Sequence, residues 1–175
     1  MAKSLFEKIV DRSVDVINEN DLSGLINIGE NAFSYCNSLT NATLPEGLTS
    51  IGIKAFTSCK SLIDITLPDS LINIEQQAFG MCSSLPKISV PKGVSNIGNL
   101  AFSHSTGSMA ITDAYFYQPS GMTITLPTAG SNYGMFYVKT ARSMNIYTDN
   151  ETIKNYAWSS DNITPTFYHL DGTAW

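Results

Sequence analysis

Three cysteines and two histidines are the residues whose types could bind a metal ion or supply a nucleophile. The cysteines are Cys36, Cys59 and Cys82, which recur at an even interval, and the histidines are His104 and His169. Zinc ligands usually lie close together along a chain, and neither histidine belongs to such a cluster. Cysteines at a wide and even interval instead indicate a small, soft side chain at a recurring buried position. We therefore expect free thiols, formed in a reducing compartment, and no metal site.

Catalytic motifs are the next chemistry that the residue pattern can test. The sequence contains no Gly-x-Ser-x-Gly elbow, no Gly-x-x-x-x-Gly-Lys loop and no dinucleotide-binding glycine pattern. His169 lies two residues before Asp171, but strand alternation and a position in the C-terminal tail argue against a histidine oriented by that carboxylate. We therefore predict a protein that is not an enzyme and needs no cofactor.

Charge and hydropathy exclude two classes of partner. Only 14% of the 175 residues are charged, and the formal net charge is −5 at pH 7. Such a chain lacks the basic surface that nucleic acids and anionic lipids require. There is no run of about 18 apolar residues, so we expect no membrane insertion. The stretch MAKSLFEKIVDRSVDV lacks the apolar core of a secretory signal, which predicts either synthesis in the cytoplasm or a signal that has been removed.

The cysteine spacing belongs to a repeat that governs most of the chain. The stretch NIGENAFSYCNSLTNATLP returns as SIGIKAFTSCKSLIDITLP and as NIEQQAFGMCSSLPKISVP, and then begins again as NIGNLAFSHSTGSMAIT. The apolar residues keep a 23-residue interval in every unit. Their columns are Ala32-Phe33, Ala55-Phe56, Ala78-Phe79 and Ala101-Phe102; Ile28, Ile51, Ile74 and Ile97; Leu25, Leu48, Leu71 and Val94; and Leu39, Leu62 and Leu85.

A period of this length predicts a solenoid, in which each repeat is one coil stacked on the next. No single coil can bury its apolar side, so each column becomes a ladder that runs down the stack. Leu62, Ile65 and Leu67 should point inward from a short strand, and the strands of successive coils should pair in parallel about 4.8 Å apart. The phenylalanines should form an aromatic spine. Gly29, Gly52 and Gly98 suit a turn, but Glu75 holds the same place, so that turn cannot require a positive φ.

The pattern SLxxITLPxSLxxIxxxAFxxCxSL resembles the BspA-type leucine-rich repeat, also called the Treponema-type repeat. The resemblance covers about residues 25–127 and includes the Ala-Phe, Cys and Leu-Pro landmarks. It implies an α/β repeat fold: a curved, right-handed leucine-rich-repeat solenoid, capped at both ends. One face would carry a parallel β-sheet, and short helical or irregular turns would line the other. Relatives of this repeat type are commonly bacterial surface proteins that bind host proteins or other cells.

The chain divides into a cap, a repeat region and a second cap. Residues 1–24 are predicted to form the N-terminal cap, with a helical turn in SLFEKIV and a first strand in SVDVI. Residues 25–127 hold four regular repeats, with an insertion near 106–121 because ITLP returns only at 124–127. Residues 128–175 hold a degenerate last repeat and the C-terminal cap. In that part we expect Phe136 to continue the spine and Ile146 to be a strand residue. A helix should follow, with Asp149 or Asn150 as its N-cap and Ile153, Tyr156 and Ala157 on one face. NITPTFYHL should form a last strand.

Two sets of outward residues are candidates for a binding surface. Strand alternation turns one set away from the core: Asn41, Thr43, Asp64, Thr66, Lys87 and Ser89, with Thr123 and Thr125 as further members. These are either ordinary solvated strand residues or a docking surface for a protein or a glycan; the hydroxyl rows are too short for an ice-binding array. Tyr115, Phe116 and Tyr117 either pack the C-terminal end cap or form an exposed contact loop.

Two classes of function remain for such a surface, and neither is enzymatic. In the first, the chain is a structural or receptor-contacting component of a bacteriophage particle, in its tail, head decoration or receptor contact, where a symmetric homo-oligomer is expected. Reduced cysteines, a Met start without an export signal, and an opening stretch similar to small prophage repeat proteins favour this hypothesis. The alternative is a bacterial cell-surface, adhesin-like module whose export signal is missing. The predicted partner is a protein or a glycan in either case.

Overall fold

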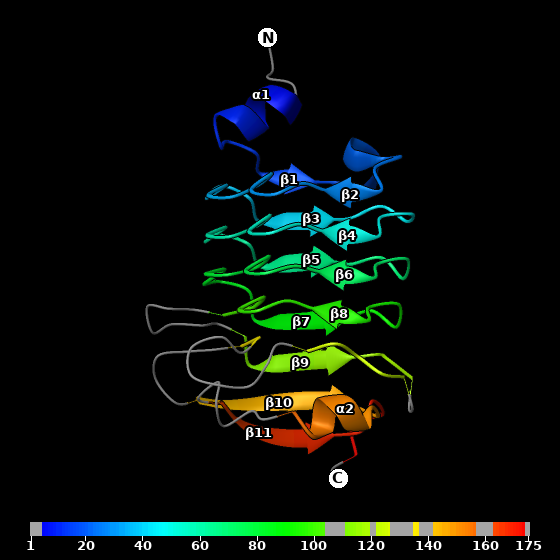
Figure 1. Ribbon diagram of the computed structural model, residues 1–175. Helices are drawn as coiled ribbons and strands as arrows, with labels where there is room; N and C mark the ends of the chain where they lie inside the picture. Colours follow the sequence, from blue (N-terminus) through cyan, green and yellow to red (C-terminus); the bar gives the residue numbers. More distant parts are fainter. Residues whose placement is uncertain are drawn as a thin grey trace.

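Successive coils of the chain stack one on another, from an N-terminal helix to a C-terminal strand (Figure 1). The computed structural model describes residues 5–103, 111–119, 122–126, 135–136, 142–156 and 163–173. Within these ranges every pairing between strands is parallel. The predicted parallel solenoid is therefore confirmed. It contains little helix, and the helical segments that the structure describes lie near the two ends.

One side of the stack carries a column of strands, one from each coil, which we call the first strand column. Inward and outward residues alternate along these strands, as in β5, where the buried Ile65 lies between the exposed Asp64 and Thr66. Neighbouring strands keep the register of the repeat, so that Asn41 pairs with Asp64 and Ala42 with Ile65. The column consists of β1 (Val16–Ile17), β3 (Asn41–Thr43), β5 (Asp64–Thr66), β7 (Lys87–Val90), β9 (Asp113–Phe116), β10 (Arg142–Thr148) and β11 (Ile163–Tyr168).

The first strand column is interrupted once along the part of the chain that the structure describes. β1, β3 and β5 form one hydrogen-bonded sheet, and β7, β9, β10 and β11 form another. The strands β5 and β7 follow one another in the stack but are not paired (Figure 1). The column is thus two sheets set end to end, with a break between β5 and β7.

A second strand column lies beside the first in Figure 1 and was not predicted. It forms because one isoleucine per coil is buried, while the polar residue before it points outward. The isoleucine ladder was predicted from the repeat, but turns were expected in this segment, since two-residue strands have no alternation to detect. The column consists of β2 (Asn27–Ile28), β4 (Ser50–Ile51), β6 (Asn73–Ile74) and β8 (Asn96–Ile97).

The aromatic spine runs through the core as predicted. Phe33, Phe56, Phe79 and Phe102 stack in sequence with ring centroids 5.0, 5.4 and 5.8 Å apart. Phe136 extends the stack 5.0 Å beyond Phe102, which confirms its predicted place in the degenerate last repeat. Each ring is at most 3% exposed. The spine therefore links neighbouring coils by direct stacking in addition to burial of apolar area.

The three cysteines line the same core as unpaired thiols. The thiol of Cys59 donates a hydrogen bond to the carbonyl of Phe33, and the thiol of Cys82 donates to Phe56. Burial raises the pKa of Cys82 to about 12, and it also raises the pKa of Cys36 and of Cys59. The thiols are thus protonated side chains that pack in the core, and two of them donate to the preceding coil.

Tight packing between coils explains two of the glycines. Gly52 and Gly98 do not have a positive φ, as the glutamate at the same place in another coil suggested. A Cβ on Gly52 would lie 2.7 Å from the carbonyl oxygen of Ile28, and one on Gly98 would lie 2.5 Å from the backbone nitrogen of Gln76. Glycine is needed there because one backbone passes close to the next.

Helical segments lie near both ends of the stack. At the N-terminus, α1 (Leu5–Val10) precedes β1, and the 3-10 turn η1 (Glu19–Leu22) follows it. The guanidinium of Arg12 donates to the carbonyls of Asn31 and Ala32 in the first coil. At the C-terminus, Asn150 is the N-cap of α2 (Glu151–Lys154), where its side chain accepts from the backbone of Thr152 and Ile153. Ile153 is the buried residue of α2, whereas Ala157 lies outside the described residues.

The coil after β8 differs from the predicted arrangement. Residues 106–121 were expected to be an insertion, but residues 113–116 form β9, which pairs with β7 from Lys87–Asp113 to Val90–Phe116. This offset is slightly longer than the 23-residue period of the earlier coils. The segment can take this place because Ala114 and Phe116 alternate in phase with the buried Ile88 and Val90. Thr125 of the ITLP stretch lies instead beside the second strand column, where it bridges Asn96.

Candidate functional site

The outer face of the first strand column is the surface on which most of the predicted binding residues come together. Two outward side chains per strand form two rows along the stack. The predicted residues Asn41 and Thr43, Asp64 and Thr66, and Lys87 and Ser89 all lie on this face and are exposed or half-buried. Thr123 and Thr125 are exposed but are not part of it, since Thr125 borders the second column.

Towards the C-terminus the row of small hydroxyl residues continues as tyrosines. The register aligns Ser89 with Tyr115, Tyr115 with Tyr147, and Tyr147 with Tyr168. The rings of Tyr115 and Tyr147 stack with centroids 4.3 Å apart, and those of Tyr147 and Tyr168 stack at 5.0 Å. In the neighbouring row, Asn145 donates a 2.9 Å hydrogen bond to Asp113. This end of the face is therefore a rigid aromatic ladder with a paired polar edge.

The contact loop proposed for Tyr115, Phe116 and Tyr117 does not exist in the structure. Tyr115 and Phe116 belong to β9, and Tyr117 is the residue that follows it. Phe116 is 0% exposed, because strand alternation turns it inward to pack edge-on against Phe136. Tyr115 and Tyr117 point outward, so two of the three residues remain on the candidate surface and Phe116 is removed from it.

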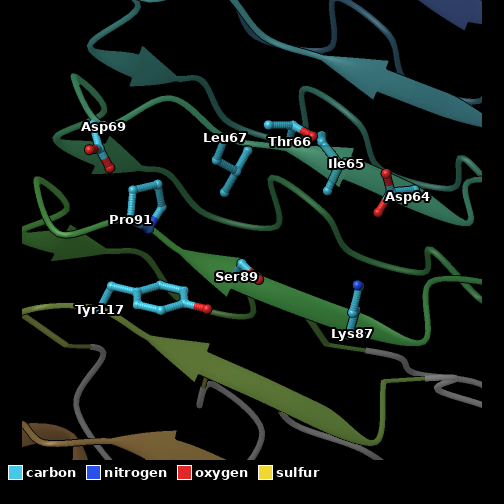
Figure 2. Close-up of a pocket in the computed structure, with 9 residues that line it drawn as sticks. All are labelled: Asp64, Ile65, Thr66, Leu67, Asp69, Lys87, Ser89, Pro91 and Tyr117. Carbon is cyan, nitrogen blue, oxygen red and sulfur yellow. The ribbon is translucent and has the colours of Figure 1, made fainter. Parts of the chain in front are cut away.

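The break between β5 and β7 is hollowed into a shallow depression, which Figure 2 shows. Its volume is about 380 Å³, within the range of small-molecule sites. Tyr117 and Pro91 lie at one end, Asp64 and Lys87 at the other, and Thr66 and Ser89 between them (Figure 2). Five of the nine predicted residues line it, together with four that were not predicted: Asp64, Thr66, Lys87, Ser89 and Tyr117, with Ile65, Leu67, Asp69 and Pro91.

Several polar groups in this depression have no hydrogen-bond or ionic partner among the described residues. The carboxylate of Asp64, the ammonium of Lys87 and the hydroxyls of Thr66 and Ser89 are such groups. Asp69 differs, because it forms a 2.7 Å ion pair with Lys92, and this pair raises the pKa of Lys92. Unpaired groups of both kinds, donors and acceptors, are therefore available to a ligand.

Backbone and side-chain hydrogen bonds hold Tyr117 in place at the edge of the depression. Its amide donates to the carbonyl of Val90 at 3.0 Å. The buried side chain of Gln118 donates through Nε2 to the carbonyl of Pro91 at 2.7 Å. The ring of Tyr117 also stacks on that of Tyr115 at 6.4 Å, yet Tyr117 remains 46% exposed. The aromatic ring is therefore positioned before any ligand binds.

Sequence reasoning missed the tyrosines beyond Tyr117, although a signal for them was present. Ile146 was predicted as an inward strand residue, and strand alternation from it turns Tyr147 outward. Tyr168 lies in the predicted last strand. Asp69 and Pro91 gave no such signal, because they follow the strands and reach the depression only through the stacking of coils.

The histidine and the carboxylates near the C-terminus form no catalytic arrangement among the described residues. His169 forms a 2.7 Å hydrogen bond through Nδ1 with Asp149, not with Asp171. The carboxylate of Asp171 accepts from the backbone and hydroxyl of Thr173, and these bonds lower its pKa. No group of three or more metal-ligating side chains occurs in the described part of the chain. His104 lies outside it. The described geometry fits a binding surface.

Comparison with known proteins supplies the family. A family model described as the BspA-type leucine-rich repeat region, in six copies, matches residues 13–112, which is more than half of the chain. The chain belongs to the BspA-type leucine-rich repeat family. Leucine-rich repeat proteins of this kind typically bind partners and are not enzymes. No match was found among curated proteins.

Solved leucine-rich repeat structures share the fold of this chain. The T. pallidum leucine-rich repeat protein TpLRR is 26% identical with a TM-score of 0.52, over 76% of this chain and 57% of that one. The pneumococcal vaccine antigen PcpA is 18% identical with a TM-score of 0.56, over 87% of this chain and 40% of that one. A leucine-rich cell surface protein from Faecalibacterium prausnitzii A2-165 is 28% identical with a TM-score of 0.45, over 56% and 26%. This chain thus spans between about a quarter and three fifths of the length of these proteins.

These comparisons bear on the two predicted contexts. Neither the family nor the structures named above support the expectation of a bacteriophage component, and the family agrees better with the alternative of a bacterial surface module. In the described residues no helix is long and apolar enough to cross a membrane.

Proposed function

We propose that this BspA-type leucine-rich repeat protein is a recognition module at the bacterial cell surface. It would hold a protein or a glycan on the outer face of the first strand column. The observation that carries the proposal is the depression between β5, β7 and Tyr117, in which unpaired polar groups lie next to a positioned aromatic ring. Family membership supports the surface context, because relatives of this repeat type are commonly bacterial surface proteins that bind other cells or host proteins.

The location is tested on intact cells of the source organism. We expect brief protease treatment of these cells to release peptides of this chain, which mass spectrometry identifies. The control is a cytoplasmic protein, whose peptides must stay inside. Peptides that instead band with phage-sized particles on a density gradient would overturn the surface location in favour of the virion.

The binding face is tested with one substitution placed on two different surfaces. Ser89→Arg places a long charged side chain in the depression, whereas Ser50→Arg places it on the second strand column. Both serines are half-buried, so the two substitutions should lower the stability of the protein by similar amounts. We expect beads coated with the wild-type protein or the Ser50 variant to adhere to cultured epithelial cells. Adhesion of beads coated with the Ser89 variant should be at least tenfold lower. Equal adhesion by all three proteins would refute the assignment of this face.

A further inference from the structure

We infer that the depression binds an uncharged, hydroxyl-rich saccharide of one to a few pyranose rings. This inference rests on the proposed function and names the chemical class of the partner. Its basis is the combination of one exposed ring, a cluster of unpaired small polar groups and a balance of charge within about 380 Å³. A depression of that volume has the size of a small-molecule site, which suits a short saccharide.

The aromatic end of the depression suits the apolar face of a sugar ring. Tyr117 is 46% exposed and lies across from Pro91, so the two residues form a small apolar platform beside the polar groups (Figure 2). The face of an aromatic ring carries partial negative charge, and the axial C–H groups of a pyranose carry partial positive charge, so the two attract. The bonds of Tyr117 and Gln118 to β7 and Pro91 fix this platform in advance, which reduces the entropy cost of binding.

The polar groups suit hydroxyls better than charged groups. Asp64 accepts hydrogen bonds only, Lys87 donates only, and the hydroxyls of Thr66 and Ser89 do both. A sugar hydroxyl can donate and accept at once, so it can satisfy neighbouring groups of either kind. The charges also offset one another, since Asp64 faces the site with Lys87, and Asp69 is neutralised by Lys92. A site without net charge does not favour an anionic or a cationic ligand.

Strand addition by an extended peptide does not fit the same place. The depression lies over the break between β5 and β7, where the pairing of strands is interrupted. A peptide strand inserted there would need about 9–10 Å between its two neighbours, which is twice the usual strand spacing. Cα atoms of β5 and β7 lie within 8 Å of each other. The break is therefore too narrow for a further strand, and recognition in the depression uses side chains.

The test uses the full chain and a panel of neutral oligosaccharides. The probes are cellotetraose, chitotetraose, maltotetraose and lacto-N-tetraose, titrated by calorimetry at millimolar concentrations after a screen on a printed glycan array. We expect at least one probe to bind. Tyr117→Ala should weaken that binding by about tenfold, Asp64→Asn should weaken it several-fold, and Tyr117→Phe should keep most of it, because the ring is what stacks.

Tyr35→Ala is the matched control, because Tyr35 is a 57% exposed tyrosine outside the depression. It should bind as the wild type does. The inference is overturned if no neutral oligosaccharide binds, if Tyr117→Ala binds unchanged, or if the array shows binding only to sulfated or sialylated glycans. It is also overturned if an immobilised peptide array is bound through Tyr117. If saccharide binding fails while adhesion remains sensitive to Ser89→Arg, the proposed recognition face stands and only the ligand class is wrong.

Discussion

Residues at the corners of the coils adopt left-handed backbone conformations without being glycine. One set is Asn31, Lys54, Gln77 and Leu100, with φ between +54° and +59°. The amides of the first three donate along the stack, as Asn31 does to Ile53 and Lys54 does to Gln76. The left-handed conformation therefore aligns these amides with the next coil, at a cost of about 1–2 kcal/mol for an ordinary residue.

This cost predicts that Lys54→Gly stabilises the protein. The side chain of Lys54 is exposed, so little packing is lost, and glycine adopts a φ of +57° without the Cβ clash. We expect the free energy of unfolding to rise by about 0.5–1 kcal/mol in urea denaturation. The control is Lys60→Gly, because Lys60 is also exposed but has no positive φ. This change should lower the free energy of unfolding by about 0.5–1 kcal/mol. Equal losses in both variants would contradict the account of the corner.

The buried thiols predict a loss of stability at alkaline pH. In the unfolded chain a thiol has a pKa of about 8.5, whereas burial raises the pKa of Cys82 to about 12 in the folded protein. The folded state thus keeps a proton that the unfolded state releases. The contribution is fully present below about pH 8.5 and is lost as the pH rises towards the folded pKa.

We expect the urea midpoint to fall between pH 8 and pH 10, with Cys82 contributing up to about 1.4 kcal/mol per pH unit. Tyr115 adds to the trend only above about pH 10, because burial raises its pKa above the usual value for a tyrosine. Cys82→Ala isolates the thiol, and its stability should decline less steeply over the same range. Parallel slopes for the variant and the wild type would show that this thiol is not the cause.

At the scale of elements, the phenylalanine spine is what joins each coil to its neighbours through the core. Phe79 stacks on Phe56 on one side and on Phe102 on the other, and it is 1% exposed. Among the described residues, Phe33 stacks on one ring, that of Phe56. The two positions carry the same residue in the same column but differ in the number of rings that they support.

Phe79→Ala should therefore cost more than Phe33→Ala. Removal of a fully buried phenylalanine costs about 3–5 kcal/mol, since it leaves a cavity in addition to the lost transfer energy. We expect Phe79→Ala to reach this range in urea denaturation and Phe33→Ala to fall below it. Phe79→Leu serves as a control that keeps most of the apolar volume and should lose less. A larger loss at Phe33 would indicate that the N-terminal cap, and not the spine, limits stability.

At the scale of the whole molecule, the fixed register makes one coil removable. Deletion of residues 50–72 removes one full period and joins Thr49 to Asn73. Ile28 would then pair with Ile74 and Ala42 with Ile88, which keeps every column in phase. In a stack where each coil contacts only its neighbours, such a chain should still fold.

We expect this deletion variant to show the circular dichroism of a β-protein and a cooperative urea transition at a lower midpoint. A deletion of residues 50–61 is the control, because the loss of only part of a period breaks the register and places inward residues outward. It should fail to fold. If both variants unfold alike, the coils are not interchangeable units, and the caps specify the register.

The candidate site was predictable in part, for reasons that differ between its residues. Asp64, Thr66, Lys87 and Ser89 were placed correctly because strand alternation from a buried isoleucine determines the side of each neighbour. Phe116 was assigned wrongly because the strand β9 departs from the regular period. Pro91 and Asp69 lie after their strands, where no local pattern indicates direction.

The sequence by itself determined the 23-residue period, the columns that form the core, and the family. It could do so because every coil has the same environment as its neighbours, so each requirement of packing is repeated in the chain. Only the tertiary structure decided the second strand column, the position of β9 and the depression beside Tyr117. These depend on how the backbone groups of one coil pair, or fail to pair, with those of the next, and that is a property of the stack rather than of any local segment.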